Sequence, residues 1–263
     1  MKPPLVIDKS FAQGATQSRL QTLSTTFSFW VPSAFYYEVF DNDSKKRKSA
    51  LKGIGRFQRF DLATVLLKEK QTGKPIPIGE IDTPFLEVNP DTLTSDWQMT
   101  PEQSDAFQQY KRRVVEPWMT FWKKFLDRRG NIGFSESELT AIRGTDEDFS
   151  VLCATLCEEK RIKRIADELA FPHVSLLNES WLYYRFFQTL TFQALVLSRR
   201  YQNDIDKRNF ERIEHDVQDI EYLTIGLHVG SLATAETSKK FSNASMGWRF
   251  RLLAPDGRLI TPE

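Results

Sequence analysis

The segment IEHDVQDIEYLTIGLHVGSLATAE, residues 213–236, combines closely spaced carboxylates with an apolar helical stripe and a short strand-like run. Asp216 and Asp219 are three residues apart, so on a helix both carboxylates project from one face. If residues 232–234 form a buried strand, Glu236 lies just past its carboxyl end, where open α/β sheets place their ligands. The spacing predicts oxygen ligands at a sheet edge, although the same acids would also suit the first turns of a surface helix.

The amino-terminal segment supplies a matching pair of acids. Residues 5–7 are a short apolar run that ends in Asp8, as in a buried parallel strand with a carboxylate at its carboxyl end. A second strand is predicted over 27–31, followed by a helix, SAFYYEVF, that carries Glu38. This order begins an α/β layer architecture in which right-handed crossover makes the strands parallel. Asp8 and Glu38 are therefore expected at the same sheet edge, where buried acids that meet require a cation.

The run from Ser44 to Phe60, SKKRKSALKGIGRFQRF, holds seven basic residues and no acid. Such a run is commonly a solvated surface. Its interleaved glycines and phenylalanines favour the alternative, a basic strip that follows a phosphate backbone and offers rings for stacking. The nucleic-acid contacts expected from this strip, together with the lysine after Asp8, are Lys9, Lys45, Lys46, Arg47, Lys48, Lys52, Arg56 and Arg59.

Helical periodicity dominates the middle of the chain. The aromatic stripe at 101–129 is typical of core packing rather than of a cofactor site. Cys153 and Cys157 are four residues apart on a predicted helix, so they are also expected to pack in the core rather than to bind a metal. The predicted helices are 17–23, 62–70, 101–129, one starting at Ser135, 149–169 and 176–200, and the further predicted strands are PIPIGEI at 75–81 and a half-exposed final strand at 248–252.

Length and composition limit the class of protein but do not indicate a binding partner. The chain has 263 residues, and its 36 basic side chains nearly cancel its 35 acidic ones, so net charge indicates no ligand. Hydrophobic residues make up 40%, with 20 Phe and 6 Trp, which favours a packed globule over disorder. No apolar run is long enough to span a bilayer, and the start, MKPPLVID, lacks the apolar core of a signal peptide. The sequence therefore predicts a cytoplasmic protein with no membrane contact.

Four segments taken in order, LVIDKS, VPSAFYYE, HDVQDIEYL and LATAE, together resemble the PIN-like nuclease superfamily. The resemblance implies an α/β, three-layer fold with a central parallel sheet flanked by helices. In that family one acid ends the first strand, a second lies on the helix after the second strand, a third lies near the start of a late helix, and a fourth follows a strand that ends in Thr. By position these acids are Asp8, Glu38, Asp219 and Glu236, with Ser10 and Thr234 as polar neighbours, and Asp216 could replace or supplement Asp219 as a metal ligand.

The resemblance covers the two ends of the chain, and the final acid, a Glu, departs from the commoner Asp. It implies a single PIN-like domain over 1–263, an elaborated member of the family. Its core halves would be 1–60 and 211–263, and a mainly helical insertion would occupy about 100–210.

The same resemblance implies a metal-dependent endonuclease, with RNA a more frequent substrate than DNA. Carboxylates select Mg²⁺ or Mn²⁺, which acidify a water that attacks the phosphodiester. Asp8 is the expected central ligand, Asp219 and Glu236 complete the metal shell, and Glu38 binds metal or orients the water. Toxin, RNA-processing and antiviral-defence roles stay open, as do an antitoxin or defence-system partner and a homo-oligomer.

Two other classes of function stay open as well. A non-catalytic module that binds nucleic acid or protein could keep a PIN-like fold without its chemistry. A metal-dependent phosphatase on a related α/β layout would act on small phosphoesters and would not need the basic strip.

Overall fold

The computed structural model describes residues 2–40, 56–87, 134–201, 210–236 and 245–262, together with residues 101, 102, 105 and 109. These residues form an α/β structure built on a six-stranded sheet with the order β4-β3-β2-β1-β5-β6. β4 pairs antiparallel to β3, and the other pairings are parallel. The strands are β1 (Pro4–Ile7), β2 (Ser28–Pro32), β3 (Arg56–Phe60), β4 (Phe85–Glu87), β5 (Ser231–Ala233) and β6 (Arg258–Ile260).

β1 lies at the centre of the parallel strands, a position that suits its apolar side chains because both faces of a central strand are buried. Leu5, Val6 and Ile7 have no exposed surface. β1 pairs with β2 on one side and, on the other, with β5 from the far end of the chain. The predicted α/β class with a parallel sheet is confirmed, and the carboxyl ends of the parallel strands share one edge.

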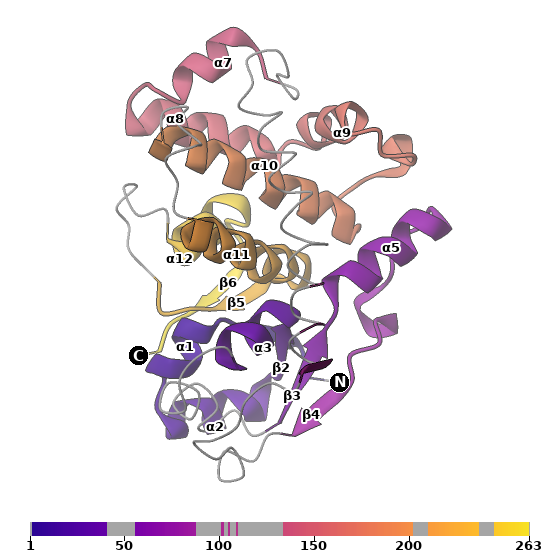
Figure 1. Cartoon of the computed structure of the whole chain (residues 1–263), viewed down its shortest axis with the longest axis vertical. Coiled ribbons are helices and arrows are strands. Elements are labelled where there is room, and N and C mark those ends of the chain that lie inside the picture. Colours follow the sequence, from indigo (N-terminus) through magenta and orange to yellow (C-terminus); the bar gives the residue numbers. More distant parts are fainter. Residues whose placement is uncertain are drawn as a thin grey trace.

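Helices flank this sheet and form a further layer beyond it. They are α1 (Lys9–Gly14), α2 (Gln17–Thr26), α3 (Ser33–Phe40), α5 (Leu62–Thr72), α7 (Glu136–Ala141), α8 (Asp146–Ala154), α9 (Glu159–Glu168), α10 (Leu182–Tyr201), α11 (Phe210–Val229) and α12 (Met246–Leu253), with 3-10 turns at Ile78–Glu80, Thr155–Cys157 and Val174–Leu176. In Figure 1, α1 and α2 lie on one side of the sheet, and α11 and α12 lie between the sheet and α7 to α10. α10 packs along α11.

Several local predictions are confirmed. The helices expected at 17–23, 62–70 and 176–200 correspond to α2, α5 and α10, although α10 begins later than predicted. α7 begins at a capping box in which the hydroxyl of Ser135 and the carboxylate of Glu138 each accept the other's backbone N–H. Cys153 is fully buried, and both cysteines are unpaired thiols. The helix predicted at 101–129 lies almost entirely outside the described residues.

Glu69 joins the sheet side of the molecule to the helical layer. It lies on α5 with no exposed surface, and its carboxylate accepts the backbone N–H groups of Leu182 (3.0 Å) and Tyr183 (2.9 Å) at the start of α10. It also accepts the N–H of Ile76 (3.2 Å). One buried carboxylate therefore satisfies donors at a helix terminus, which would otherwise be without partners.

The third strand was predicted in the wrong place. Instead of a strand at 75–81, residues Ile78–Glu80 form a 3-10 turn. Pro75 and Pro77 have no N–H to donate to a sheet ladder. The third strand is β3, inside the segment interpreted as a basic strip, where Phe57 and Phe60 are buried.

The strand predicted at 248–252 is also wrong, because this segment lies in α12. Ser245 caps the helix, since its hydroxyl accepts the N–H of Trp248 (3.4 Å). The buried positions recur every three or four residues, the spacing of a helix face, rather than every two residues. They include Met246, Arg249, Phe250 and Leu253.

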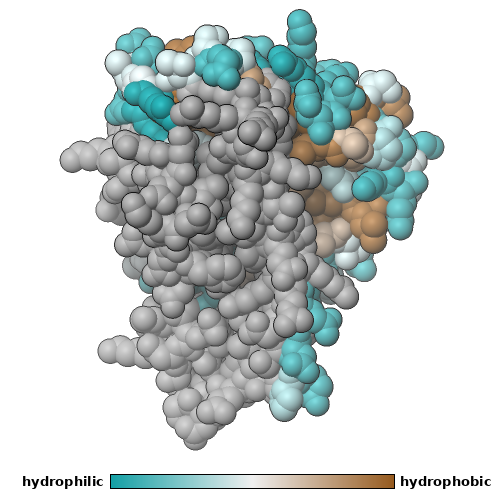
Figure 2. Space-filling model, turned by 45° about the horizontal axis from the view of Figure 1, so that its top comes forward, coloured by the Kyte–Doolittle hydropathy of each residue, from teal (hydrophilic) through white to brown (hydrophobic). Residues whose placement is uncertain are grey.

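The surface of the described chain mixes polar side chains with a few exposed apolar ones. Figure 2 shows one face, on which apolar residues gather along the right flank among hydrophilic side chains. Among large apolar residues, Phe85 is 53% exposed and Leu176 is 55% exposed. Within the described ranges, every helix falls short of the length or the hydropathy needed to cross a membrane.

We expect the protein to lose stability in acid because of His228, in the last turn of α11. Its ring nitrogens are buried and have no hydrogen-bond partner among the described residues. Burial, together with the nearby charge of Arg185, lowers its pKa from 6.5 to about 4. As the pH drops, His228 is protonated in the unfolded chain at a higher pH than in the folded protein. The free energy of unfolding therefore falls as the pH drops from about 6.5 to about 4. We expect the acid-induced fall in the free energy of unfolding to be smaller by about 2–3 kcal/mol in His228→Leu than in the unchanged protein.

Urea unfolding of both proteins near pH 7 and near pH 4 measures this effect. If the free energy of unfolding falls by the same amount in the variant and in the unchanged protein, His228 is not the source of the acid sensitivity.

Candidate functional site

Asp8 occupies the carboxyl end of β1, as predicted, and is the N-cap of α1. Its backbone N–H donates to the carbonyl of Ala233 (2.9 Å), which continues the pairing with β5. One carboxylate oxygen accepts the N–H of Ser10 (3.3 Å), and the other accepts the hydroxyls of Ser10 and of Thr234 (2.7 Å to Thr234). These bonds fix a carboxylate that is only 6% exposed, and they place both predicted polar neighbours beside it.

Glu236 is tied to the same edge through Thr234. Its backbone N–H donates to the Thr234 hydroxyl oxygen (3.0 Å), the group that also contacts Asp8. Its carboxylate accepts the N–H of Met246 (3.3 Å) at the start of α12. A Cβ at Gly247 would lie 2.7 Å from the carbonyl oxygen of Glu236, so the close approach of α12 to this segment requires glycine there.

Glu38 reaches the site from α3 and is held by two side chains. The hydroxyl of Tyr222 donates to one carboxylate oxygen of Glu38 (2.6 Å), and the Lys9 ammonium lies 3.6 Å from the other. Burial, and then the negative charge of Glu38, keeps the pKa of Tyr222 well above its ordinary value, so Tyr222 remains a donor. Glu221, one residue earlier on α11, accepts the N–H of Ala34 (3.0 Å) and thereby fixes the start of α3.

Asp219 and Asp216 come from α11, with Asp219 facing α12. An Nη1 of Arg249 lies 3.2 Å from an oxygen of Asp219 and also donates to the side-chain oxygen of Gln193 (2.7 Å). Arg249 is only 3% exposed. Burial raises the pKa of Asp219 well above its ordinary value. Arg249 opposes this shift, and the charges of Glu236 and Asp216 add to it.

The electrostatics connect these acids to Asp8. Burial is the main cause that raises the pKa of Asp8 from 3.8 to about 6, against the bonds from Ser10 and Thr234. The charges of Glu236 and Glu38 raise it further, and Asp8 in turn raises the pKa of Asp219. Asp8 therefore lies within electrostatic range of acids from three other segments, Glu38 on α3, Asp219 on α11 and Glu236 after β5.

The site offers donor atoms that suit a metal ion, but they are not arranged as a complete coordination shell. All the candidate ligands are carboxylates, the oxygen donors that Mg²⁺ and Mn²⁺ prefer, and their mutual repulsion would be relieved by a cation. Among the described residues, however, no group of three or more His, Cys, Asp or Glu side chains is arranged to hold a metal ion. The donors named above, including Tyr222 and Arg249, hold the carboxylates instead. Binding would therefore require some of these side chains to turn toward a common point.

The predicted nucleic-acid contacts are only partly brought to this edge. Lys9 lies in the site beside Glu38. Arg56 is the first residue of β3, at the opposite end of the strands from Asp8, so the structure does not bring it to the acids. Arg59 lies nearer the carboxyl end of β3, 4.0 Å from Asp61. The other predicted contacts, Lys45, Lys46, Arg47, Lys48 and Lys52, lie outside the described residues.

Three residues of this site were not predicted as part of it. Tyr222 was assigned to the apolar stripe of its helix, and Arg249 to a strand. Glu221 carried no signal beyond its charge. Ser is a residue type preferred at helix N-caps, so Ser245 is a local signal that could have indicated the start of α12.

No protein-family model matches this chain, and no similar protein was found among the curated proteins or among the solved structures. Function must therefore be inferred from the chemistry of the site itself.

Proposed function

We propose that this protein is a Mg²⁺- or Mn²⁺-dependent endonuclease that acts on RNA in preference to DNA, on an elaborated PIN-like fold. The supporting observation is that Asp8, Glu38, Asp219 and Glu236 all lie toward the carboxyl edge of a parallel sheet, where burial and neighbouring carboxylates raise the pKa values of Asp8 and Asp219. Their positions after β1, on α3, on α11 and after β5 agree with the resemblance carried by the sequence. The helices α7 to α10 would belong to the helical insertion.

Asp8, Asp219 and Glu236 would hold the metal, with Asp216 as a further ligand. A bound Mg²⁺ or Mn²⁺ supplies positive charge that neutralises the scissile phosphate and acidifies the attacking water. Ser10 and Thr234 orient Asp8 through its hydrogen bonds. Glu38, held by Tyr222, would orient the attacking water, and Lys9 would contact the phosphate.

The direct test is incubation of the purified protein with labelled RNA and labelled DNA, with Mn²⁺, with Mg²⁺ and with EDTA. We expect cleavage of RNA with either metal, slower cleavage of DNA, and a loss of cleavage in EDTA of at least about a hundredfold. Cleavage that persists in EDTA would contradict a metal-dependent mechanism, and release of phosphate from small phosphoesters without strand cleavage would indicate a phosphatase.

A second candidate is a non-catalytic module that binds nucleic acid or protein. The observation that favours it is that protein donors hold the carboxylates while no three-residue metal group forms among the described residues. Under this alternative, the protein would retain labelled RNA in a mobility-shift assay but leave it intact with every metal.

A further inference from the structure

A pocket lies away from the acids, at the amino-terminal ends of the strands. Its volume is about 670 Å³, within the range of ligand sites in proteins. Pro4, Ser28 and Arg56, the first residues of β1, β2 and β3, line it. Because a strand rises roughly 3.3 Å per residue, Pro4 at this end of β1 is about 13 Å from Asp8, and none of the acids of the candidate site lines the pocket. The pocket is therefore separate from the candidate active site.

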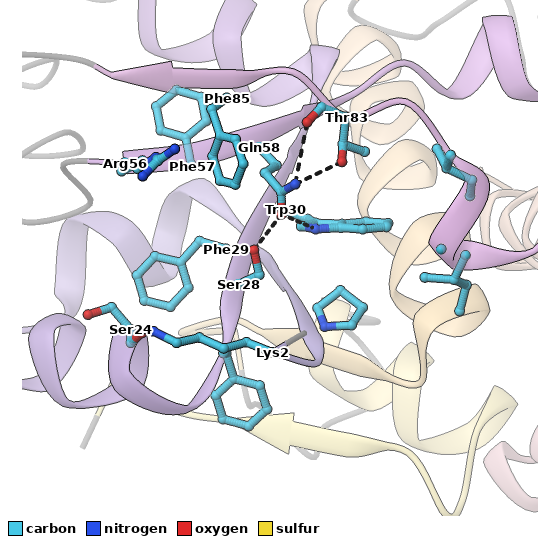
Figure 3. A pocket seen from close by; sticks show the side chains of 15 residues that line it. Lys2, Ser24, Ser28, Phe29, Trp30, Arg56, Phe57, Gln58, Thr83 and Phe85 are labelled. Atoms are coloured by element: carbon cyan, nitrogen blue, oxygen red, sulfur yellow. Dashed lines mark hydrogen bonds between the residues drawn. The ribbon is translucent and has the colours of Figure 1, made fainter.

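Aromatic rings make up much of the wall of this pocket (Figure 3). Four of them are buried and one, Phe85 on the edge strand β4, is 53% exposed. The guanidinium of Arg56 lies 4.0 Å from the centre of the Phe85 ring, in a cation–π contact. The aromatic residues of the lining are Phe27, Phe29, Trp30, Phe57 and Phe85. This composition suits a flat ring that stacks against the wall.

The neutral polar groups of the wall are occupied by one another. The side-chain oxygen of Gln58 accepts the indole N–H of Trp30 (2.8 Å) and the hydroxyl of Ser28. The amide nitrogen of Gln58 donates to the hydroxyl of Thr83 (3.0 Å), as the dashed lines in Figure 3 show. This network fixes the orientation of Trp30. The charged side chains of the lining are Lys2 and Arg56.

The charged side chains that line the pocket are basic. These are Lys2 and Arg56, and the described lining contains no Asp or Glu. Arg56 is also part of the segment from Ser44 to Phe60, which holds seven basic residues and no acid. Lys2 donates to the backbone carbonyl of Ser24, which keeps its ammonium at the pocket. The ligand should therefore carry negative charge as well as a flat ring.

We propose that this pocket binds a nucleotide, with the base stacked on the aromatic wall and the phosphate beside Arg56 and Lys2. The nucleotide is either free or at the end of a nucleic-acid chain. A nucleotide combines the two required features, and each is matched by a separate part of the lining. The proposal does not depend on cleavage at the acids, since binding can be measured with the metal removed.

Isothermal titration calorimetry in EDTA tests the proposal with adenosine monophosphate and with a 5′-phosphorylated dinucleotide as probes. We expect at least one to bind with a Kd tighter than about 1 mM. Phe85→Ala and Arg56→Gln should each weaken binding about tenfold. Adenosine, which lacks the phosphate, should bind at least about tenfold more weakly than its monophosphate. The matched controls Leu176→Ala and Arg143→Gln, at exposed positions outside the lining, should bind as the unchanged protein does.

Gly79 allows a second test that leaves the ring and the cations in place. It lines the pocket, and a Cβ built on it meets no atom within 4 Å, so a side chain there has open space. Because Gly79 is an exposed residue of the lining, Gly79→Trp should reduce nucleotide binding about tenfold by obstructing the mouth of the pocket. Absence of binding by both probes, or unchanged binding in Gly79→Trp and Phe85→Ala, would overturn the proposal. Because no arm requires metal or cleavage, neither result bears on the proposed nuclease activity.

Discussion

Asp8→Asn should abolish metal-dependent cleavage and, in EDTA, make the folded protein more stable than the unchanged protein at about pH 8. The loss of cleavage is expected to reach at least about a thousandfold, because Asp8 is the buried carboxylate to which the other acids are electrostatically linked. In Asp8→Asn the amide oxygen can keep the N-cap bond from the N–H of Ser10, and the amide N–H₂ can donate to the hydroxyl oxygens of Ser10 and Thr234, which would turn to accept it. The N-cap of α1 is then kept, so the fold should persist.

The gain in stability follows from the raised pKa of Asp8, about 6 against an ordinary 3.8. The folded protein binds this proton more tightly than the unfolded chain does. The resulting stabilisation is complete below about pH 3.8 and is lost as the pH rises through about 6. At pH 8 the buried carboxylate therefore costs on the order of 2–3 kcal/mol, which Asn would not incur. Near pH 4 the variant and the unchanged protein should differ little.

Activity assays and urea unfolding in EDTA measure the two effects. Asp61→Asn is the matched control, since Asp61 is the N-cap of α5 and its carboxylate accepts the N–H of Thr64 (3.0 Å). That variant should retain cleavage. Full activity of Asp8→Asn would show that Asp8 is not required for cleavage. Equal stability of the variant and the unchanged protein at pH 8 would show that burial of the Asp8 carboxylate does not destabilise the fold. Mn²⁺ should raise the unfolding midpoint of the unchanged protein but not of Asp8→Asn.

Glu69→Ala should cost roughly 3–5 kcal/mol of folding free energy, a large fraction of the stability of a typical domain. The substitution removes the acceptor of three backbone N–H groups, those of Ile76, Leu182 and Tyr183, and leaves them buried without it. Burial raises the pKa of Glu69, while the bonds from these N–H groups oppose the shift. The carboxylate is therefore retained in a buried position by its bonds to the start of α10.

Chemical unfolding followed by circular dichroism measures this loss. Lys68→Ala, at the neighbouring exposed position of α5, is the control and should change stability by less than about 0.5 kcal/mol. Glu69→Gln should fall between Glu69→Ala and the unchanged protein, because it keeps one oxygen acceptor but turns an N–H₂ group toward backbone donors. A loss below about 1 kcal/mol in Glu69→Ala would show that water or rearrangement replaces the carboxylate.

The strands that build the site were predictable because their signal is local. Apolar runs at β1, β2 and β5 are buried on both faces, and each is followed by a polar residue or a helix start. β3 was not predicted because its buried residues, Phe57 and Phe60, lie among arginines and Gln58 in a segment whose composition is basic. α12 was missed because alternating aromatic and basic residues imitate a half-exposed strand.

The sequence by itself determined which acids stand at the edge of the sheet, because strand ends and helix starts depend on residues close together in the chain. Only the tertiary structure decided that Tyr222 holds Glu38 and that Arg249 holds Asp219. These contacts join segments up to 184 residues apart. No local periodicity encodes them, since they depend on how α11 and α12 pack against the finished sheet.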